Sequence, residues 1–168
     1  LNFMIELKYN GLLYDVDLNR DYQIRMERQM DELKDRIFSA VGEEFNLESS
    51  QECAHILFGK MGLSTTITTK GGGSSTSGDA LKEMYKQYGH SWLKDMAVYG
   101  DISGAYGNFI KGYVEKYVKR DGRIHPNYIL HGTSSHRISG NDPNLLNIPS
   151  PKHGYNIRQC YMVPPGYA

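Results

Sequence analysis

The side chains best suited to chemistry lie in one short stretch near the C-terminus, residues 137–149, which reads RISGNDPNLLNIP. It holds one arginine and three asparagines but a single carboxylate, Asp142. Guanidinium and amide groups can hydrogen-bond phosphate oxygens and base edges without bringing negative charge to a nucleic acid. Arg137 could reach the minor-groove acceptors that every base pair presents, a contact that senses duplex shape rather than sequence.

Two leucines in the middle of this stretch suggest how it would be held. Leu145 and Leu146 could anchor the loop in a core while Asn144 and Asn147, which flank them, face outward. The alternative is that the asparagines satisfy the backbone of their own turns. On residue types alone, both interpretations stay open.

The charge pattern allows a nucleic-acid partner without demanding one. Nineteen basic and nineteen acidic side chains cancel, whereas a protein held to nucleic acid by bulk attraction usually has a basic excess. The basic residues nevertheless gather late, and after Arg123 the only acid is Asp142. The late group comprises Lys111, Lys116, Lys119, Arg120, Arg123, Arg137, Lys152 and Arg158. The sequence therefore predicts a locally positive C-terminal end.

Other kinds of site have less support. No spacing suggests a catalytic nucleophile, and the six histidines form no zinc-type cluster, although His131 and His136 could share a metal in a loop. No pair of acids in the C-terminal strands could hold magnesium. Cys53 and Cys160 are expected to be buried free thiols in a reducing compartment. We predict neither catalytic residues nor metal ligands within this chain.

A long amphipathic helix is expected over residues 18–41, after Gly11 and Asp15 interrupt the opening apolar segment. Packing within the same chain is the favoured interpretation. Coiled-coil pairing with another chain is the alternative, but the pattern is short and lacks strict heptads. The apolar positions recur at steps of three and four, as one face of a helix does: Met26, Met30, Leu33, Ile37 and Val41.

A second helix and a polar loop follow. Ser49 and Glu52 form a capping box, in which hydroxyl and carboxylate each accept a hydrogen bond from a free backbone N–H, and Gly62 is a natural stop. Residues 65–78 are rich in Gly, Ser and Thr, and a flexible loop is expected there. Thr76 with Asp79 is expected to cap the next helix, which runs to about Tyr88.

The second half changes from a helical to an extended pattern. One or two helices are expected over residues 92–118, and strands over 123–130 and 157–163. Helices followed by strands around an irregular connection define an α+β fold. Glycine weakens a helix by roughly 1 kcal/mol relative to alanine. The glycines within the helical part are therefore expected to mark breaks, close approaches or flexible points: Gly100, Gly104, Gly107 and Gly112.

The chain shows no sequence signal that would direct it to a membrane. No apolar run approaches the length of a membrane span, and the N-terminus has no signal-peptide pattern. A soluble protein of the cytoplasm is expected, with an organelle left open. Because the chain starts at Leu1 rather than Met, it is expected to be a piece of a longer protein or a processed product.

Taken together, several stretches resemble DNA polymerase family A, the DNA polymerase I-like family. The segment HRISGNDPNLLNIP is similar to the family pattern Thr-Gly-Arg-Leu-Ser-Ser-x-Asp-Pro-Asn-Leu-Gln-Asn-Ile-Pro. Further resemblances lie, in the family's order, in LKYNGLLYD, FNLESSQECAHILFGKMGL, STSGDAL, DGRIHPNYILHGTSSHR and HGYNIRQCYMVPPGY. Order and spacing are kept along nearly the whole chain, which makes the resemblance more specific than any single motif.

The resemblance implies a helical thumb subdomain over residues 1–120 and the first strands of the palm over residues 121–168. The thumb would grip primer–template DNA, and the palm loop would touch the DNA from the minor groove near the primer end. Ser139 would help to shape that loop. The predicted DNA-binding residues are Arg137, Ser139, Asn144, Asn147, His136, Asn108 and Lys111.

The sequence also departs from the family pattern. His136 stands where the family usually has glycine, which puts close backbone approach to the DNA in doubt. Gly104 and Gly107 take the positions of a lysine and a serine in the thumb. Asn108 and Lys111 are expected to replace, in part, the DNA contacts of that lysine and serine.

The family's catalytic groups would fall outside this chain. The first catalytic aspartate would lie a few residues beyond Ala168, with the fingers helix and the second aspartate also missing. Nucleotidyl transfer by two magnesium ions needs those carboxylates. The chain is therefore expected to be inactive alone, and to be the primer–template-binding portion of a DNA-directed DNA polymerase, a nucleotidyltransferase of DNA replication that uses Mg²⁺ and dNTP.

The missing palm and fingers would come from the same polypeptide or from a second one, as in a split polymerase. A stand-alone duplex-binding module that kept the grip without catalysis is the alternative, and a polymerase-derived protein-interaction domain is a third reading.

Overall fold

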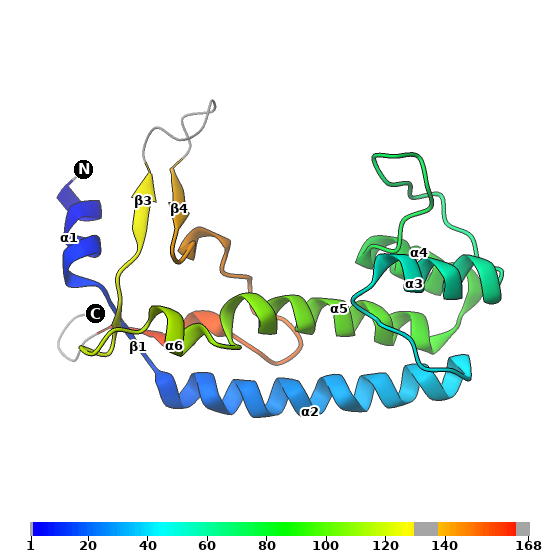
Figure 1. Ribbon diagram of the computed structural model, residues 1–168, viewed down its shortest axis with the longest axis horizontal. Coiled ribbons are helices and arrows are strands. Elements are labelled where there is room, and N and C mark those ends of the chain that lie inside the picture. The colour runs from blue at the N-terminus through cyan, green and yellow to red at the C-terminus, as the bar shows by residue number, and fades with distance from the viewer. Residues whose placement is uncertain (1, 130–137, 164–168) are drawn as a thin grey trace. The chain divides into compact units, whose positions relative to one another are not determined.

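This computed structural model describes residues 2–129 and 138–163 (Figure 1). Two compact units make up this part of the chain. The helical unit is Arg25–Gly104, and the mixed unit holds the described residues up to Ile24 and from Ala105 onward. The predicted boundary at residue 120 coincides with neither limit, and the assignment of thumb and palm stays a prediction.

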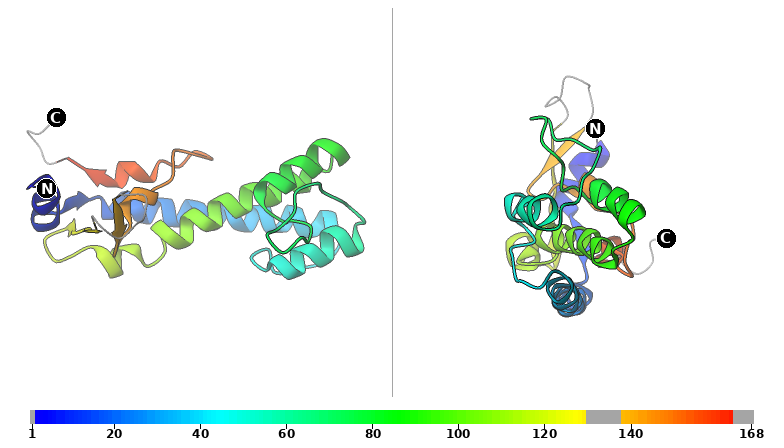
Figure 2. Two further views of the ribbon diagram at one scale, coloured as in Figure 1. Left: turned by 90° about the horizontal axis from the view of Figure 1, so that it is seen from above. Right: turned by 90° about the vertical axis from the view of Figure 1, so that its right-hand side faces the viewer.

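One face of helix α2 (Val16–Val41) supplies the core of the helical unit. All five predicted apolar positions, from Met26 to Val41, are buried. They are joined by Leu57 of the π-helix η1 (His55–Lys60), Met84 of α4 (Gly78–Tyr88) and Leu93 of α5 (Ser91–Phe109). Figure 2 shows α3 (Ser50–Ala54), α4 and α5 gathered beside this part of α2. Packing within the chain, rather than a coiled coil, is confirmed.

The helix starts are set by serine hydroxyls. Ser49 caps α3 and accepts from the Glu52 N–H at 3.3 Å, as predicted. The Glu52 carboxylate does not complete the predicted box, because it accepts from the N–H of Asn46 at 2.8 Å. The cap of α4 is Ser77, which accepts from the N–H of Ala80 at 3.4 Å, so the prediction of Thr76 is wrong by one residue.

Helix α5 runs unbroken through three glycines that were expected to mark breaks, close approaches or flexible points. Gly100, Gly104 and Gly107 are exposed, and a methyl group added at any of them would meet nothing within 4 Å. They are therefore neither breaks nor close approaches. Apolar residues of the same helix are buried, and that packing outweighs the low intrinsic propensity of glycine. The chain leaves the helical path at Gly112, where φ is +65°, before α6 (Tyr113–Tyr117).

The mixed unit contains two small antiparallel sheets. In the first, β1 (Leu12–Tyr14) lies between β2 (Arg123–Ile124) and β5 (Tyr161–Met162), with Leu13 opposite both Arg123 and Met162. In the second, β3 (Asn127–Ile129) pairs with β4 (Ser139–Asn141). Helices together with antiparallel strands confirm the predicted α+β class.

The predicted strands are shorter in the structure. Pro126, which cannot donate to a ladder, separates β2 from β3 within the expected strand 123–130. The expected strand 157–163 begins as a 3₁₀ helix, η3 (Ile157–Cys160), and only then becomes β5. Helix α1 (Asn2–Asn10) opens the chain and ends at Gly11. Gly11 has φ of +66°, and an added Cβ would lie 2.9 Å from the His125 ring.

Tyrosines that are buried or partly buried hold the mixed unit together. The Tyr113 and Tyr161 hydroxyls are 2.7 Å apart, and the Asn19 amide donates to the Tyr14 hydroxyl at 2.8 Å. The Tyr14 and Tyr161 rings meet edge to face, with centroids 5.2 Å apart. Burial raises the pKa of Tyr113 to about 12, so its hydroxyl remains protonated and can serve as a hydrogen-bond donor at neutral pH. These polar groups are satisfied internally, which makes the cluster a structural core.

Candidate nucleic-acid interface

The amide-rich loop, residues 138–149, is fixed at its start by strand pairing. Tyr128 lies opposite Gly140, and Ile129 opposite Ser139. The Ser139 hydroxyl donates to the Ile129 carbonyl at 3.4 Å. Ser139 therefore contributes to the shape of the loop. His136 and Arg137, the preceding members of the predicted DNA-binding set, lie outside the described residues.

The two predicted asparagines of this loop have different surroundings. Asn144 caps the short helix η2 (Leu145–Asn147), and its side-chain oxygen accepts from the Leu146 N–H at 3.1 Å. Its oxygen thus satisfies a local turn, which was the alternative interpretation. Asn147 is exposed. The loop therefore combines one shape-forming amide with one presented to its surroundings.

The leucines do not anchor the loop as predicted. Leu146 is 53% exposed, and Leu145 is only partly buried. Pro143 is buried instead, and the Arg158 guanidinium donates to the Ile148 carbonyl at 3.2 Å. A short 3₁₀ helix turns successive side chains about 120° apart, so two neighbouring leucines cannot both face one core.

A second group of polar residues extends this surface. The Asn127 amide donates to the Asn141 side-chain oxygen at 2.9 Å, and Lys8 donates to Asn127 at 3.3 Å. Neither Asn127 nor Lys8 was among the predicted site residues. The amide-to-amide pair could have been suspected only from the strand register, which places these asparagines opposite each other.

Two predicted contact residues and one further lysine lie near the end of α5 and on α6. Asn108, near the end of α5, and Lys111, just after it, are exposed, and both belong to the mixed unit. On α6, a hydrogen bond with Tyr117 raises the pKa of Lys116, and the Asp142 carboxylate contributes to the same shift. This electrostatic contact agrees with the views in Figures 1 and 2, in which β4 and η2 lie next to the junction of α5 and α6.

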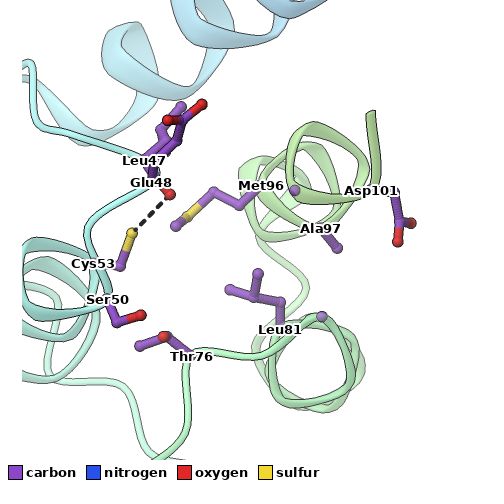
Figure 3. A pocket seen from close by; sticks show the side chains of 11 residues that line it. Leu47, Glu48, Ser50, Cys53, Thr76, Leu81, Met96, Ala97 and Asp101 are labelled. Atoms are coloured by element: carbon purple, nitrogen blue, oxygen red, sulfur yellow. Dashed lines mark hydrogen bonds between the residues drawn. The ribbon is translucent and has the colours of Figure 1, made fainter. Parts of the chain in front are cut away.

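The helical unit contains a pocket of about 280 Å³, shown in Figure 3. Cys53 lines it, and its thiol donates to the Leu47 carbonyl at 3.5 Å. Burial raises the pKa of Cys53 to about 11, and does the same for Cys160, so both thiols stay protonated at neutral pH. The prediction of two buried free thiols is confirmed. This pocket therefore offers no activated nucleophile.

The described residues hold no group of three or more His, Cys, Asp or Glu side chains that could bind a metal ion. The His131 and His136 pair falls outside them. In the same part of the chain, no helix combines the length and apolar character needed to cross a membrane. The described part of this surface offers hydrogen bonding by amides and hydroxyls and charge attraction by lysines.

The helical unit and the mixed unit with its exposed amide loop together resemble a solved polymerase domain. The structure matches the polymerase domain of Pol1 from M. smegmatis, solved in complex with DNA primer–template and dNTP, with a TM-score of 0.89 and 28% sequence identity. The match covers 98% of this chain and 29% of that one.

The model of DNA polymerase family A matches residues 16–168, so the chain belongs to that family. Among curated relatives, it is 31% identical to DNA polymerase I of Pseudomonas aeruginosa and 27% identical to that of Chloroflexus aurantiacus. These matches cover 98% and 99% of this chain, which spans 18% of the length of either relative.

Proposed function

We propose that this chain is the primer–template-binding portion of a template-directed DNA polymerase. The observation that carries the proposal is the amide-rich loop, which is shaped by its own hydrogen bonds and presents Asn147 with a single carboxylate, Asp142, nearby. Such a surface suits phosphate oxygens and base edges. The likeness to a polymerase domain that holds primer–template DNA supports this choice of partner.

Within this proposal the predicted residues take two roles. Ser139 and Asn144 hold the loop in shape, whereas Asn147, Asn108 and Lys111 contact the duplex. Arg137 and His136 complete the contact surface near the primer end. Residues 1–120 would act as the thumb and residues 121–168 as the first part of the palm.

The catalytic carboxylates and their Mg²⁺ ions would come from outside these residues, in the same polypeptide or in a second one. The described residues do not fit a magnesium site, because they contain no group of three or more His, Cys, Asp or Glu side chains that could hold a metal ion. In the completed enzyme, incoming dNTP would be joined to the primer held by this chain. The chain by itself would bind DNA and extend nothing.

Duplex binding by the purified chain tests the proposal. A primer–template should bind with an affinity that falls as salt rises, because each lysine or arginine on a phosphate releases about one counterion. Fluorescence anisotropy with labelled primer–template, at several salt concentrations, measures both affinity and slope. No binding at low salt would exclude the proposed function.

Reconstitution separates this proposal from a stand-alone DNA-binding module. A separately expressed fragment with the missing palm and fingers, mixed with this chain, Mg²⁺ and dNTP, should extend a labelled primer. DNA binding with no extension in any such mixture would favour the module. Extension by this chain alone would contradict the assignment of the catalytic carboxylates to other residues.

A further inference from the structure

Helix α1 is attached to the rest of the mixed unit by polar contacts at its C-terminal end. None of residues 5–10 is buried, and Ile5 and Tyr9 are 47% and 78% exposed, so apolar packing contributes little there. The last carbonyls of a helix lack partners within the helix and carry partial negative charge, so cationic donors suit them. Two of these carbonyls, those of Lys8 and Asn10, face the side chains of His125 and Arg123.

Both ring nitrogens of His125 face oxygen atoms. Nδ1 lies 2.9 Å from the Lys8 carbonyl, and Nε2 lies 3.0 Å from the Asp121 carboxylate. A carbonyl and an ionised carboxylate can only accept hydrogen bonds, so the ring must donate from both nitrogens to satisfy both contacts. Only the imidazolium form of histidine carries two N–H groups. The geometry around His125 therefore suits the charged ring and not the neutral one.

The charges around the ring agree with this protonation state. The Lys8 carbonyl and the Asp121 carboxylate raise the pKa of His125, and the hydrogen bond from His125 lowers the pKa of Asp121. Partial burial of the ring and the positive charge of Arg123 oppose the rise without cancelling it. On α1, the Lys8 ammonium is directed to the Asn127 side-chain oxygen, 3.3 Å away, rather than to the ring.

The chain leaves α1 directly against this ring. Gly11 is buried, with φ of +66°, and an added Cβ would lie 2.9 Å from the His125 ring and 3.0 Å from the Ile124 carbonyl. The Arg123 guanidinium donates to the Asn10 carbonyl at 3.3 Å. The end of α1 is thus tied to the start of the second half of the mixed unit at three consecutive places, and His125 makes two of these contacts.

A row of hydrogen bonds connects α1 with the amide-rich loop. Lys8 donates to the Asn127 side-chain oxygen, and the Asn127 amide donates to the Asn141 side-chain oxygen at 2.9 Å. Because an ammonium group can only donate, Lys8 turns the oxygen of Asn127 toward α1 and its NH₂ group toward Asn141. Asn141 is exposed and accepts through its oxygen, so its NH₂ group is the half that can meet an outside acceptor.

We propose that charged His125 is a positioning residue that holds the end of α1 and, through Lys8 and Asn127, orients the amide-rich loop for duplex DNA. This inference rests on the proposed function. A surface that is ordered before binding loses less conformational entropy on contact, which raises affinity. DNA binding would therefore depend on the proton of a side chain that does not itself touch the DNA.

The pH profile of duplex binding tests the charged state. The folded pKa of His125 is raised, so its stabilisation of α1 is fully present below the ordinary histidine pKa and is lost as pH rises through the folded value. Duplex affinity, measured by fluorescence anisotropy, should fall by about three- to tenfold over that rise. His136, a predicted DNA contact, is present in every variant below, so differences between their profiles isolate His125.

Two substitutions of the ring separate positioning from packing. His125→Ala removes both donors and should lower duplex affinity to the level that the unchanged chain reaches at high pH. His125→Asn keeps one amide donor for the Lys8 carbonyl but has no titrating proton, so it should recover part of the affinity and lose the pH dependence. The matched control is His90→Gln, whose ring stacks on Trp92 in the helical unit. This control should keep the affinity and pH profile of the unchanged chain.

A change at the carboxylate should move the midpoint of the profile. Asp121→Asn keeps an oxygen for the Arg123 N–H, which donates to Asp121 at 3.1 Å, but removes the negative charge that faces the ring. The pKa of His125 should then fall, and the loss of duplex affinity should move to lower pH. Nitrogen NMR of the ring measures its protonation, and amide exchange of residues 5–10 measures the attachment of α1. Circular dichroism melts verify that each variant folds.

The outcomes distinguish this inference from the proposed function. If the unchanged chain binds no primer–template at low salt, both fail. If it binds, and folded His125→Ala binds equally well at every pH, only the inference fails. A ring that titrates at the ordinary histidine pKa, or α1 amides that exchange equally fast in the unchanged chain and in His125→Ala, would also overturn it. A pH-dependent loss that His125→Asn abolishes and Asp121→Asn shifts would support it.

Discussion

The amide-rich loop and the hydroxyl-rich hairpin, residues 64–77 of the helical unit, are two polar surfaces held in shape by different means. The first is shaped by strand pairing and by bonds such as Asn144 to Leu146, which are two residues apart. The second depends on Glu83 of α4, which lies 17 and 18 residues from the threonines whose hydroxyls it binds. Strand pairing, a local amide cap and the Arg158 guanidinium fix the first, whereas an ionised carboxylate fixes the second. The comparison predicts that the two surfaces respond differently to mutation and to pH.

The largest effect is expected at Arg137. Arg137→Ala should weaken primer–template binding by roughly tenfold or more, since a bidentate or minor-groove arginine contact contributes about 1–3 kcal/mol. In a completed enzyme it should also impair extension. Arg20→Ala, which removes the same charge from an exposed site on α2, is the control. Indistinguishable extension of matched and mismatched termini with and without Arg137 would contradict a minor-groove role.

The two asparagines of the amide-rich loop should separate shape from contact. Asn144→Ala removes the acceptor for the Leu146 N–H, and should lower the stability of the mixed unit by about 1 kcal/mol. Asn147→Ala should leave the melting temperature unchanged but weaken duplex binding several-fold. Thermal melts and anisotropy, run on both variants, measure the difference. Equal behaviour of the two variants in both assays would contradict separate roles for Asn144 in loop shape and Asn147 in DNA contact.

Substitution of one lysine in each unit should show whether the amide-rich loop and the hydroxyl-rich hairpin contact the same duplex. Lys111→Ala and Lys70→Ala should each reduce the salt slope by about one, and the double variant by about two. Additive slopes would support simultaneous contact with the same DNA. A double variant whose slope equals that of Lys111→Ala would show that the hairpin makes no phosphate contact.

The smallest effect concerns pH and is confined to the hairpin. The pKa of Glu83 is lowered in the folded protein, so its contribution to stability is present above the ordinary glutamate pKa and is lost as pH falls through the lower folded value. Amide exchange of residues 64–77 should therefore speed up, relative to the intrinsic rate, in acid. Strands β3 and β4 contain no carboxylate, so their amide exchange should show no such acceleration in acid. Glu83→Gln should abolish the acid response of the hairpin.

Much of the helical unit could be predicted from the sequence because its signals are local. The three- and four-residue steps of α2 gave its buried face, and the helix begins two residues before the expected start. Ser49 was correctly identified as a cap, since a hydroxyl three residues before its target is a short-range arrangement. The resemblance along the chain gave the family.

The failures share a physical cause, which is dependence on distant residues. Gly100, Gly104 and Gly107 were expected to mark breaks, close approaches or flexible points, but the helix continues through them because its other side chains are packed. The contacts of the Gly- and Ser-rich loop could not be predicted, because Glu83, which accepts from the Thr66 hydroxyl, lies 17 residues away. The exposure of Leu146 followed from the 3₁₀ turn at η2, which the leucine pair itself does not indicate.

The two buried thiols have a practical consequence for experiments that follow conformational change with a dye attached to one cysteine. Burial raises the pKa of Cys53 and Cys160 to about 11, so both thiols should react only slowly with thiol-reactive dyes at neutral pH. A single cysteine introduced at exposed Gly71, where an added Cβ would meet only the Thr69 hydroxyl oxygen at 3.9 Å, would then carry the only attached dye, at the hairpin tip. Another at Gly104, where an added side chain meets open space, would serve as a reference position. The native protein thus already provides the background needed for single-site labelling and for following the hairpin as DNA arrives.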